Sequence, residues 1–100
     1  MTECREIVSV AADHPALAGH FPDNPIVPGV LLLDLALTAI ARRRPVSLVA
    51  IETVKFLGLL RPGELCTIVW DQPSIHTGQQ LVTFRCLTAT ALVAEGSLWL

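Results

Sequence analysis

The sequence predicts an α+β domain in which an antiparallel sheet wraps around one long central helix. Only one segment, Val30 to Arg43, has the composition of a long helix, and it is apolar on nearly every side, as expected for a buried helix. The segments before and after it are rich in β-branched residues and are broken by Pro and Gly. Strands must therefore cover the helix. At 100 residues, the chain is expected to form one domain spanning residues 1–100.

Five strands are predicted, over residues 6–12, 48–57, 65–70, 80–88 and 92–100. Pro62 and Gly63 stand at the two central positions of a type II turn before the third strand. A hairpin connection is expected at His76–Gln79. Residues 13–28 contain four prolines and cannot form a regular element. A loop of this length inside a small domain is usually functional.

The composition favours a dimer or a larger oligomer. The chain is 52% hydrophobic and 16% charged, with a mean hydropathy of +0.57, which is more apolar surface than so small a domain can bury alone. Its net charge of −2 provides no basic field for nucleic acid, so nucleic acid is excluded as a partner.

The cysteines and the N-terminus indicate a cytoplasmic protein without a metal site. Cys4, Cys66 and Cys86 have no metal-ligand spacing, and free thiols in a reducing compartment are expected. The first residues are acidic and do not look like a signal peptide. The most apolar window, residues 26–41, is shorter than a membrane span and contains Asp34, so no span is expected.

His20 and Asp34 are the candidate catalytic residues. His20 lies in the proline-rich loop beside Phe21, where apolar neighbours would keep the imidazole neutral, the form that a general base needs. Asp34 lies on the apolar helix, where burial would favour the protonated carboxyl of a general acid. The alternatives are an inert loop histidine and a carboxyl that is hydrogen-bonded to Thr38 or to a neighbouring strand.

Gly29 is the third candidate, because it carries an early N–H group of the helix. Such groups lack partners within the helix and bind negative charge, and the oxygen of an enolate formed from a thioester would be well placed there. The alternative is that Pro28 and Gly29 only start the helix, which is a common arrangement.

The segment Gly19-His20-Phe21-Pro22-x-Asn24-Pro25-Ile26-x-Pro28-Gly29-Val30-Leu31 resembles the active-site motif of the 3-hydroxyacyl-[acyl-carrier-protein] dehydratases of fatty-acid synthesis. That family has the hotdog fold. Asp34 stands at the position of its second catalytic residue. Weaker similarity to the family is found at Val54-Lys55-Phe56 and at residues 60–64 and 92–95. Together with the motif, the resemblance spans the chain from about Val8 to the C-terminus.

The resemblance implies a mechanism without a cofactor. His20 would act as the base at C2 of a carrier-bound 3-hydroxyacyl thioester, and Asp34 would act as the acid or orient water at C3. The Gly29 N–H group would polarise the thioester carbonyl, with Phe21 and Val30 also at the substrate. The family further implies a dimer in which His20 of one chain faces Asp34 of the other along an acyl tunnel. The partners expected are therefore an acyl carrier protein and a second hotdog subunit, identical or different.

Three departures from the family bear on the substrate. Asp34 replaces the Glu of the branch whose loop is most similar, and Asp is typical of the branch that also isomerises the double bond. Asp23 replaces a residue that is often Gly. The N-terminal helix and extra strand that many family members use to cover the tunnel are not expected in this sequence. A short or specialised acyl chain, as in aryl polyene or polyketide-like gene clusters, is therefore expected.

Two other functions are compatible with the same fold. A hotdog thioesterase would use a carboxylate to activate water against the thioester, although such branches typically lack the His-Phe-Pro loop. A non-catalytic hotdog subunit would pair with a catalytic dehydratase. Release of a free thiol would distinguish the first alternative, and restoration of activity by a partner would distinguish the second.

Overall fold

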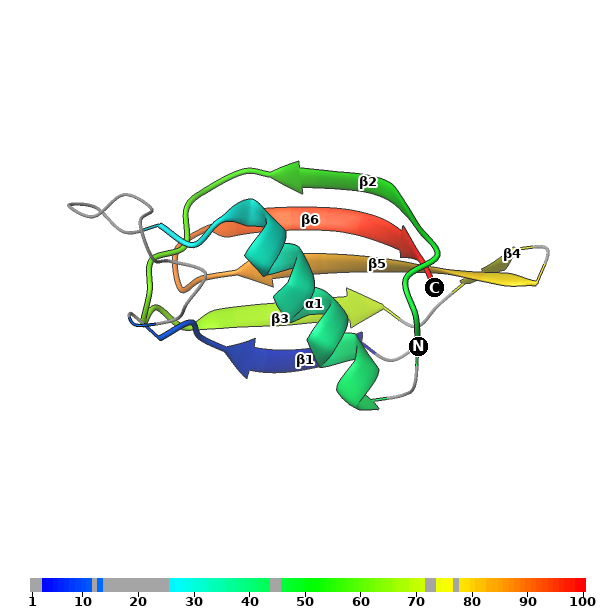
Figure 1. Ribbon diagram of the computed structural model, residues 1–100, viewed down its shortest axis with the longest axis horizontal. Coiled ribbons are helices and arrows are strands. Elements are labelled where there is room, and N and C mark those ends of the chain that lie inside the picture. Colours follow the sequence, from blue (N-terminus) through cyan, green and yellow to red (C-terminus); the bar gives the residue numbers. More distant parts are fainter. Residues whose placement is uncertain (1–2, 12, 14–25, 44–45, 72–73, 77) are drawn as a thin grey trace.

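The computed structural model describes residues 3–11, 13, 26–43, 46–71, 74–76 and 78–100. Within them the chain forms one helix and six strands (Figure 1). In chain order the elements are β1 (Glu3–Val8), α1 (Gly29–Arg43), β2 (Ala50–Phe56), β3 (Cys66–Asp71), β4 (Ser74–His76), β5 (Gln79–Leu87) and β6 (Leu92–Trp99). The predicted α+β class is confirmed.

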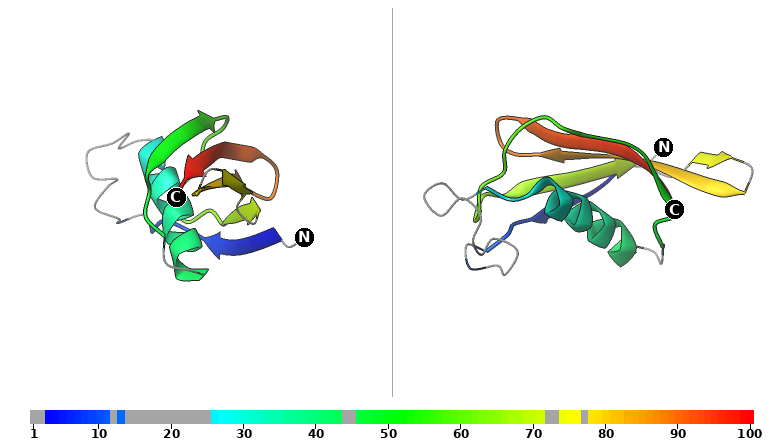
Figure 2. Two further views of the ribbon diagram at one scale, coloured as in Figure 1. Left: turned by 90° about the vertical axis from the view of Figure 1, so that its right-hand side faces the viewer. Right: turned by 45° about the horizontal axis from the view of Figure 1, so that its top comes forward.

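The strands form one antiparallel sheet in the order β1-β3-β5-β6-β2, with β4 paired only to β5. The strands β1 and β2 therefore lie at the two edges. Helix α1 lies across one face of the sheet (Figure 1), and the end-on view in Figure 2 shows the strands curving past one side of it. The core lies between α1 and this inner face.

Most predicted elements are confirmed, because their signals are local. The helix, predicted over Val30–Arg43, begins one residue earlier at Gly29. The type II turn is present, with Gly63 at φ +82° and the Glu64 N–H group donating to the Arg61 carbonyl at 3.1 Å. A glycine is favoured there because a residue with a side chain rarely adopts this left-handed conformation.

Two strand predictions need correction. The first strand covers Glu3–Val8 rather than 6–12, because its pairing with β3 ends where Val8 meets Cys66. The structure also adds β4, a strand of three residues that is too short to give a pattern. It forms a hairpin with β5 in which His76 is opposite Gln79, at the place where a hairpin connection is expected.

The prediction that α1 is buried on nearly every side is wrong for the single chain. Its buried residues are Leu32, Ala36, Ala39 and Ile40, which face the sheet. Val30, Asp34 and Thr38 are exposed, and their spacing of four places them on one stripe of the helix. The sheet passes only one side of α1, and no other element of the described chain covers this stripe.

The edge strand β2 carries an unusual amount of exposed apolar surface. We call the large side chains on this strand and its flanks the β2 apolar edge; they are exposed by 42% to 63%, and comprise Leu48, Val49, Ile51, Phe56, Leu57 and Leu59. A soluble chain rarely exposes so many neighbouring apolar side chains unless they contact a partner. An edge strand also presents unpaired backbone groups to which another chain can hydrogen-bond.

Two cysteines lie together in the core. Cys66 of β3 and Cys86 of β5 are fully buried, and Cys86 is paired with Ile68, two residues from Cys66. A hydrogen bond with the Cys66 thiol, together with burial, raises the pKa of the Cys86 thiol. Because the thiolate is the reactive form of cysteine, Cys86 is unsuited to be a nucleophile.

We expect iodoacetamide to leave Cys66 and Cys86 unmodified in the native protein between about pH 7 and pH 9. A raised pKa keeps the Cys86 thiol protonated over this range, and burial excludes the reagent from both sites. Mass spectrometry after urea denaturation should show all three cysteines modified. Rapid labelling of Cys86 in the native protein would contradict this description of the core.

Candidate functional site

The predicted general base lies outside the described part of the chain. His20 and Phe21 belong to residues 14–25, which the structure does not describe. The description resumes at Ile26, and Val27 is buried at 3% exposure. The roles of His20 and Phe21 therefore remain predictions, while the structure locates the helix start that follows them.

The start of α1 lies at the expected position, directly after Pro28. The Pro28 carbonyl accepts hydrogen bonds from the N–H groups of Leu31 at 3.0 Å and Leu32 at 3.3 Å. Among the described residues, none accepts a backbone hydrogen bond from the N–H groups of Gly29 or Val30. Because the first N–H groups of a helix have no partner within it and lie at the positive end of its dipole, this site can stabilise a developing negative charge.

The helix start is fixed to the chain that leaves β2. The Val27 N–H group donates to the Leu60 carbonyl at 2.8 Å, and Leu60 is fully buried. The N–H groups of Leu57 and Gly58 both donate to the Val93 carbonyl, at 2.9 and 3.2 Å. The segment after β2 is thus bonded to the sheet on one side and to the helix entry on the other.

Phe56 is the residue at this site that the sequence analysis misses. A Cβ atom built on Gly29 would lie 3.0 to 3.1 Å from three carbon atoms of the Phe56 ring. The ring therefore packs directly against the first residue of α1. In the sequence, Phe56 stands out only as part of Val54-Lys55-Phe56, where the similarity to the family is weak. Its contact with Gly29, 27 positions away, leaves no local signal in a single sequence.

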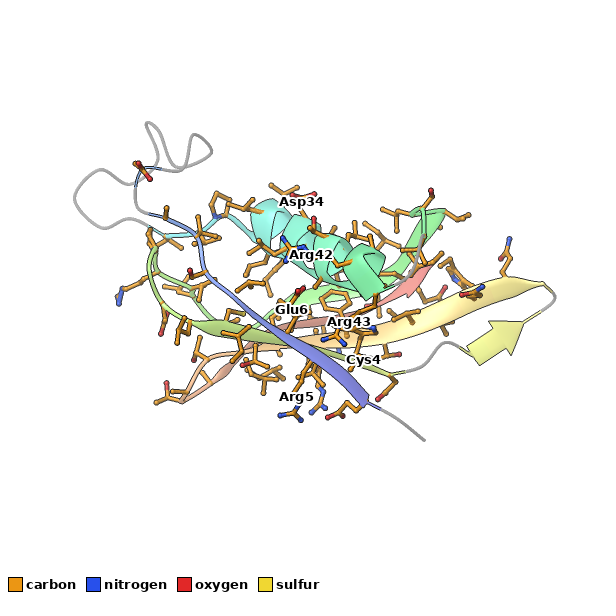
Figure 3. The ribbon with its side chains drawn as sticks, turned by 90° about the horizontal axis from the view of Figure 1, so that it is seen from below. Cys4, Arg5, Glu6, Asp34, Arg42 and Arg43 are labelled. Carbon is orange, nitrogen blue, oxygen red and sulfur yellow. The ribbon has the colours of Figure 1, made fainter. Side chains whose placement is uncertain are left out.

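Asp34 lies on the open side of α1 and is not buried by its own chain. Its side chain is exposed, and Figure 3 shows it on the side of the helix away from the sheet. The expected burial of this carboxyl is therefore wrong for the single chain, for the reason that leaves the whole stripe uncovered. Val30, one helical turn before it, is 75% exposed, so the two residues can face a common partner or ligand.

The other end of α1 is attached to β1 by its arginines. Arg42 forms an ion pair with Glu6 at 3.2 Å, and Arg43 donates to the Arg5 carbonyl at 2.9 Å (Figure 3). The Arg43 guanidinium also lies 5.9 Å from the centre of the Trp70 ring, within cation–π range. These contacts fix the direction of the helix, so its N-terminal end points to the β2 side of the sheet.

Two surface hollows of the described residues lie away from this site. One of about 180 Å³ is on the outer face over β2, β5 and β6, and another of about 410 Å³ is near Ile7 and Leu65. Neither includes Gly29 or Asp34. The described residues contain no group of three His, Cys, Asp or Glu side chains placed to hold a metal ion. They also include no helix that is long and apolar enough to cross a membrane.

The comparisons with known proteins agree with the motif. The sequence model of the ApeI-like family, described as ApeI dehydratase, matches residues 2–97. The 3-hydroxyacyl-[acyl-carrier-protein] dehydratase FabZ of Chlamydia caviae is 30% identical, over 96% of this chain and 71% of that protein. FabZ of Wolbachia pipientis wMel is also 30% identical, over 94% of this chain and 72% of that protein.

Solved structures share the fold. A chain of the dehydratase heterocomplex ApeI:P from Xenorhabdus doucetiae matches with a TM-score of 0.79 and 24% identity, over 96% of this chain and 84% of that chain. A protein from Archaeoglobus fulgidus matches with a TM-score of 0.78 and 18% identity, over 98% of this chain and 74% of that chain. The chain therefore has the hotdog fold and belongs to the ApeI-like family of dehydratases.

Proposed function

We propose that the chain removes water from a 3-hydroxyacyl thioester on an acyl carrier protein and yields the trans-2-enoyl thioester, in fatty-acid or polyketide-like synthesis. The observation that carries the proposal is the start of α1. There the Gly29 N–H group has no backbone acceptor among the described residues, and it follows the loop that contains His20. Membership of a dehydratase family supports the reaction class.

The proposed reaction needs only the residues of the site. His20 removes the proton from C2, and the negative charge that develops on the thioester oxygen is stabilised by the Gly29 N–H group at the positive end of α1. Asp34 assists departure of the C3 hydroxyl as water, either by donating a proton to it or by orienting it while protonated His20 returns the proton taken from C2. Phe21 and Val30 provide apolar contacts beside the thioester.

A second hotdog chain would complete this site. In the single chain, Asp34 lies on the uncovered stripe of α1, and the β2 apolar edge is exposed next to the helix start. A chain added along β2 would pair with its free backbone groups, cover this edge and bring another α1 close to the stripe. We propose that His20 of one chain then faces Asp34 of the other. The second chain is a further copy or a different hotdog subunit.

The role of His20 as the base can be tested by an activity assay. Purified protein incubated with a panel of 3-hydroxyacyl carrier-protein thioesters should give products that are lighter by one water. His20→Ala should lower kcat by about 10² to 10⁴-fold, the usual contribution of a general base. Asp34→Asn, which keeps the size of the side chain, should lower kcat without releasing the acyl chain.

The same assay separates the rival functions. Free carrier thiol in place of the enoyl product would indicate a thioesterase. A protein that is inactive alone but active together with a second hotdog subunit would indicate a subunit that pairs with a catalytic dehydratase. Dehydration that survives His20→Ala would refute the assignment of His20 as the base.

Association through β2 can be tested by substitutions at the two edge strands. The protein should sediment as a dimer, and Ile51→Lys should shift it toward the monomer, because Ile51 is 49% exposed on the β2 apolar edge and a charge there is costly to bury. Ile7→Lys is the matched control, since Ile7 is 65% exposed on the opposite edge strand β1. A dimer lost with Ile7→Lys and kept with Ile51→Lys would contradict pairing along β2. A wild-type protein that stays monomeric would favour a different subunit as the partner.

A further inference from the structure

Gly29 is a glycine in a place where the helix itself does not require one. Its backbone is helical and not in the left-handed region, which, of the glycines that the structure describes, only Gly63 and Gly78 adopt. Alanine is the better helix former. The neighbour that opposes a side chain at this position is the Phe56 ring, with three carbon atoms 3.0 to 3.1 Å from where a Cβ atom would lie.

Phe56 is held in place by the strand and by the chain that follows it. Its position in β2 is opposite Ala94 of β6, which is buried on the inner face of the sheet. The hydrogen bonds of Leu57 and Gly58 to the Val93 carbonyl then fix the backbone directly after the ring. The ring is 52% exposed, so one part packs on Gly29 and another part faces outward beside the helix start.

We propose that Phe56 is a positioning residue for the Gly29 N–H group. This inference rests on the proposed dehydratase function and adds a residue to its machinery. The ring packs against Gly29, fixes the first turn of α1 and excludes water from one side of the N–H group. The requirement for glycine at position 29 arises from this contact and not from the space that the thioester needs.

The two explanations for Gly29 make opposite predictions about a double variant. If the ring is what excludes a side chain, removal of the ring makes room for one, and Gly29→Ala becomes harmless in the Phe56→Ala background. If the thioester needs the space, Gly29→Ala impairs the enzyme in either background. Because Phe56 is half-exposed at a sheet edge, Phe56→Ala should fold, and Phe56→Leu provides a smaller change.

The experiment is a double-mutant cycle on the whole protein with two measurements. The wild type, Gly29→Ala, Phe56→Ala and the double variant are compared by kcat and KM on a carrier-bound 3-hydroxyacyl thioester, and by the midpoint of urea unfolding. Leu57→Ala combined with Gly29→Ala is the control, because Leu57 is adjacent and 53% exposed but is not among the nearest neighbours of Gly29.

We expect Gly29→Ala alone to lower kcat about 10²-fold, as for a displaced donor to the developing oxyanion, and to lower the urea midpoint. Phe56→Ala should lower kcat about 10-fold with little change in KM, because it loosens an interaction that is needed mainly in the transition state. The double variant should match Phe56→Ala in kcat, and Gly29→Ala should no longer lower its midpoint. Leu57→Ala should give no such rescue.

Losses of kcat that multiply in the double variant would overturn the proposal and assign the glycine requirement to the substrate. A wild-type protein without dehydratase activity on any carrier-bound substrate would refute the proposed function instead. If the wild type is active, coupling in the urea midpoint without coupling in kcat would show a purely structural contact and would contradict the positioning role. Measurements of kcat and of the urea midpoint together thus distinguish failure of the proposed function from failure of the positioning role.

Discussion

The hydrogen bond from the Val27 N–H group to the Leu60 carbonyl, at 2.8 Å, joins the chain that enters α1 to the chain that leaves β2. Much of the candidate site depends on this connection. It fixes where the helix starts, and therefore where the N–H group of Gly29 lies. It also brings the end of β2 close enough for the Phe56 ring to pack on that glycine. At the other end of the helix, Arg42 and Arg43 attach α1 to β1, so the direction of the helix dipole is set by contacts at both ends.

The second constraint is that one sheet cannot cover both sides of the helix. Leu32, Ala36 and Ile40 are buried against the strands, whereas Val30 and Asp34 are exposed. In the single chain, the Asp34 side chain is open to solvent. The same carboxylate at a chain–chain interface loses water and gains new neighbours, which is how an acid group is tuned for proton transfer. Under the proposed function, assembly of two chains and assembly of the active site are one event.

The sequence predicts the elements whose signals are local. The composition of α1, its proline-glycine start and the Pro62-Gly63 turn each specify structure over a few residues, and the structure agrees with all three. The first strand is displaced because hydrophobic residues near Val8 show strand propensity but not where pairing with β3 ends. The half-covered helix was predicted to be buried because composition reports how apolar a helix is, and not which chain covers it.

The residues of the candidate site likewise divide into those with a local sequence signal and those without one. Gly29 and Asp34 are found from a motif that is continuous in sequence, and the structure places both on α1, with Asp34 exposed rather than buried. Phe56 is missed because its contact with Gly29 connects two elements that only the fold brings together. His20 and Phe21 lie outside the described residues, so their assignment depends on the motif.

The most direct test of the central claim, that two chains complete one active site, is a subunit-mixing experiment. His20→Ala and Asp34→Asn proteins, each expected to be strongly impaired alone, are unfolded together, refolded in equal amounts and assayed for dehydration. If His20 and Asp34 of opposite chains form one site, mixed dimers contain one intact site of two, and activity should recover to about a quarter of the wild-type value in a symmetric homodimer. A mixture that forms mixed dimers and yet stays as inactive as its parents would contradict the account.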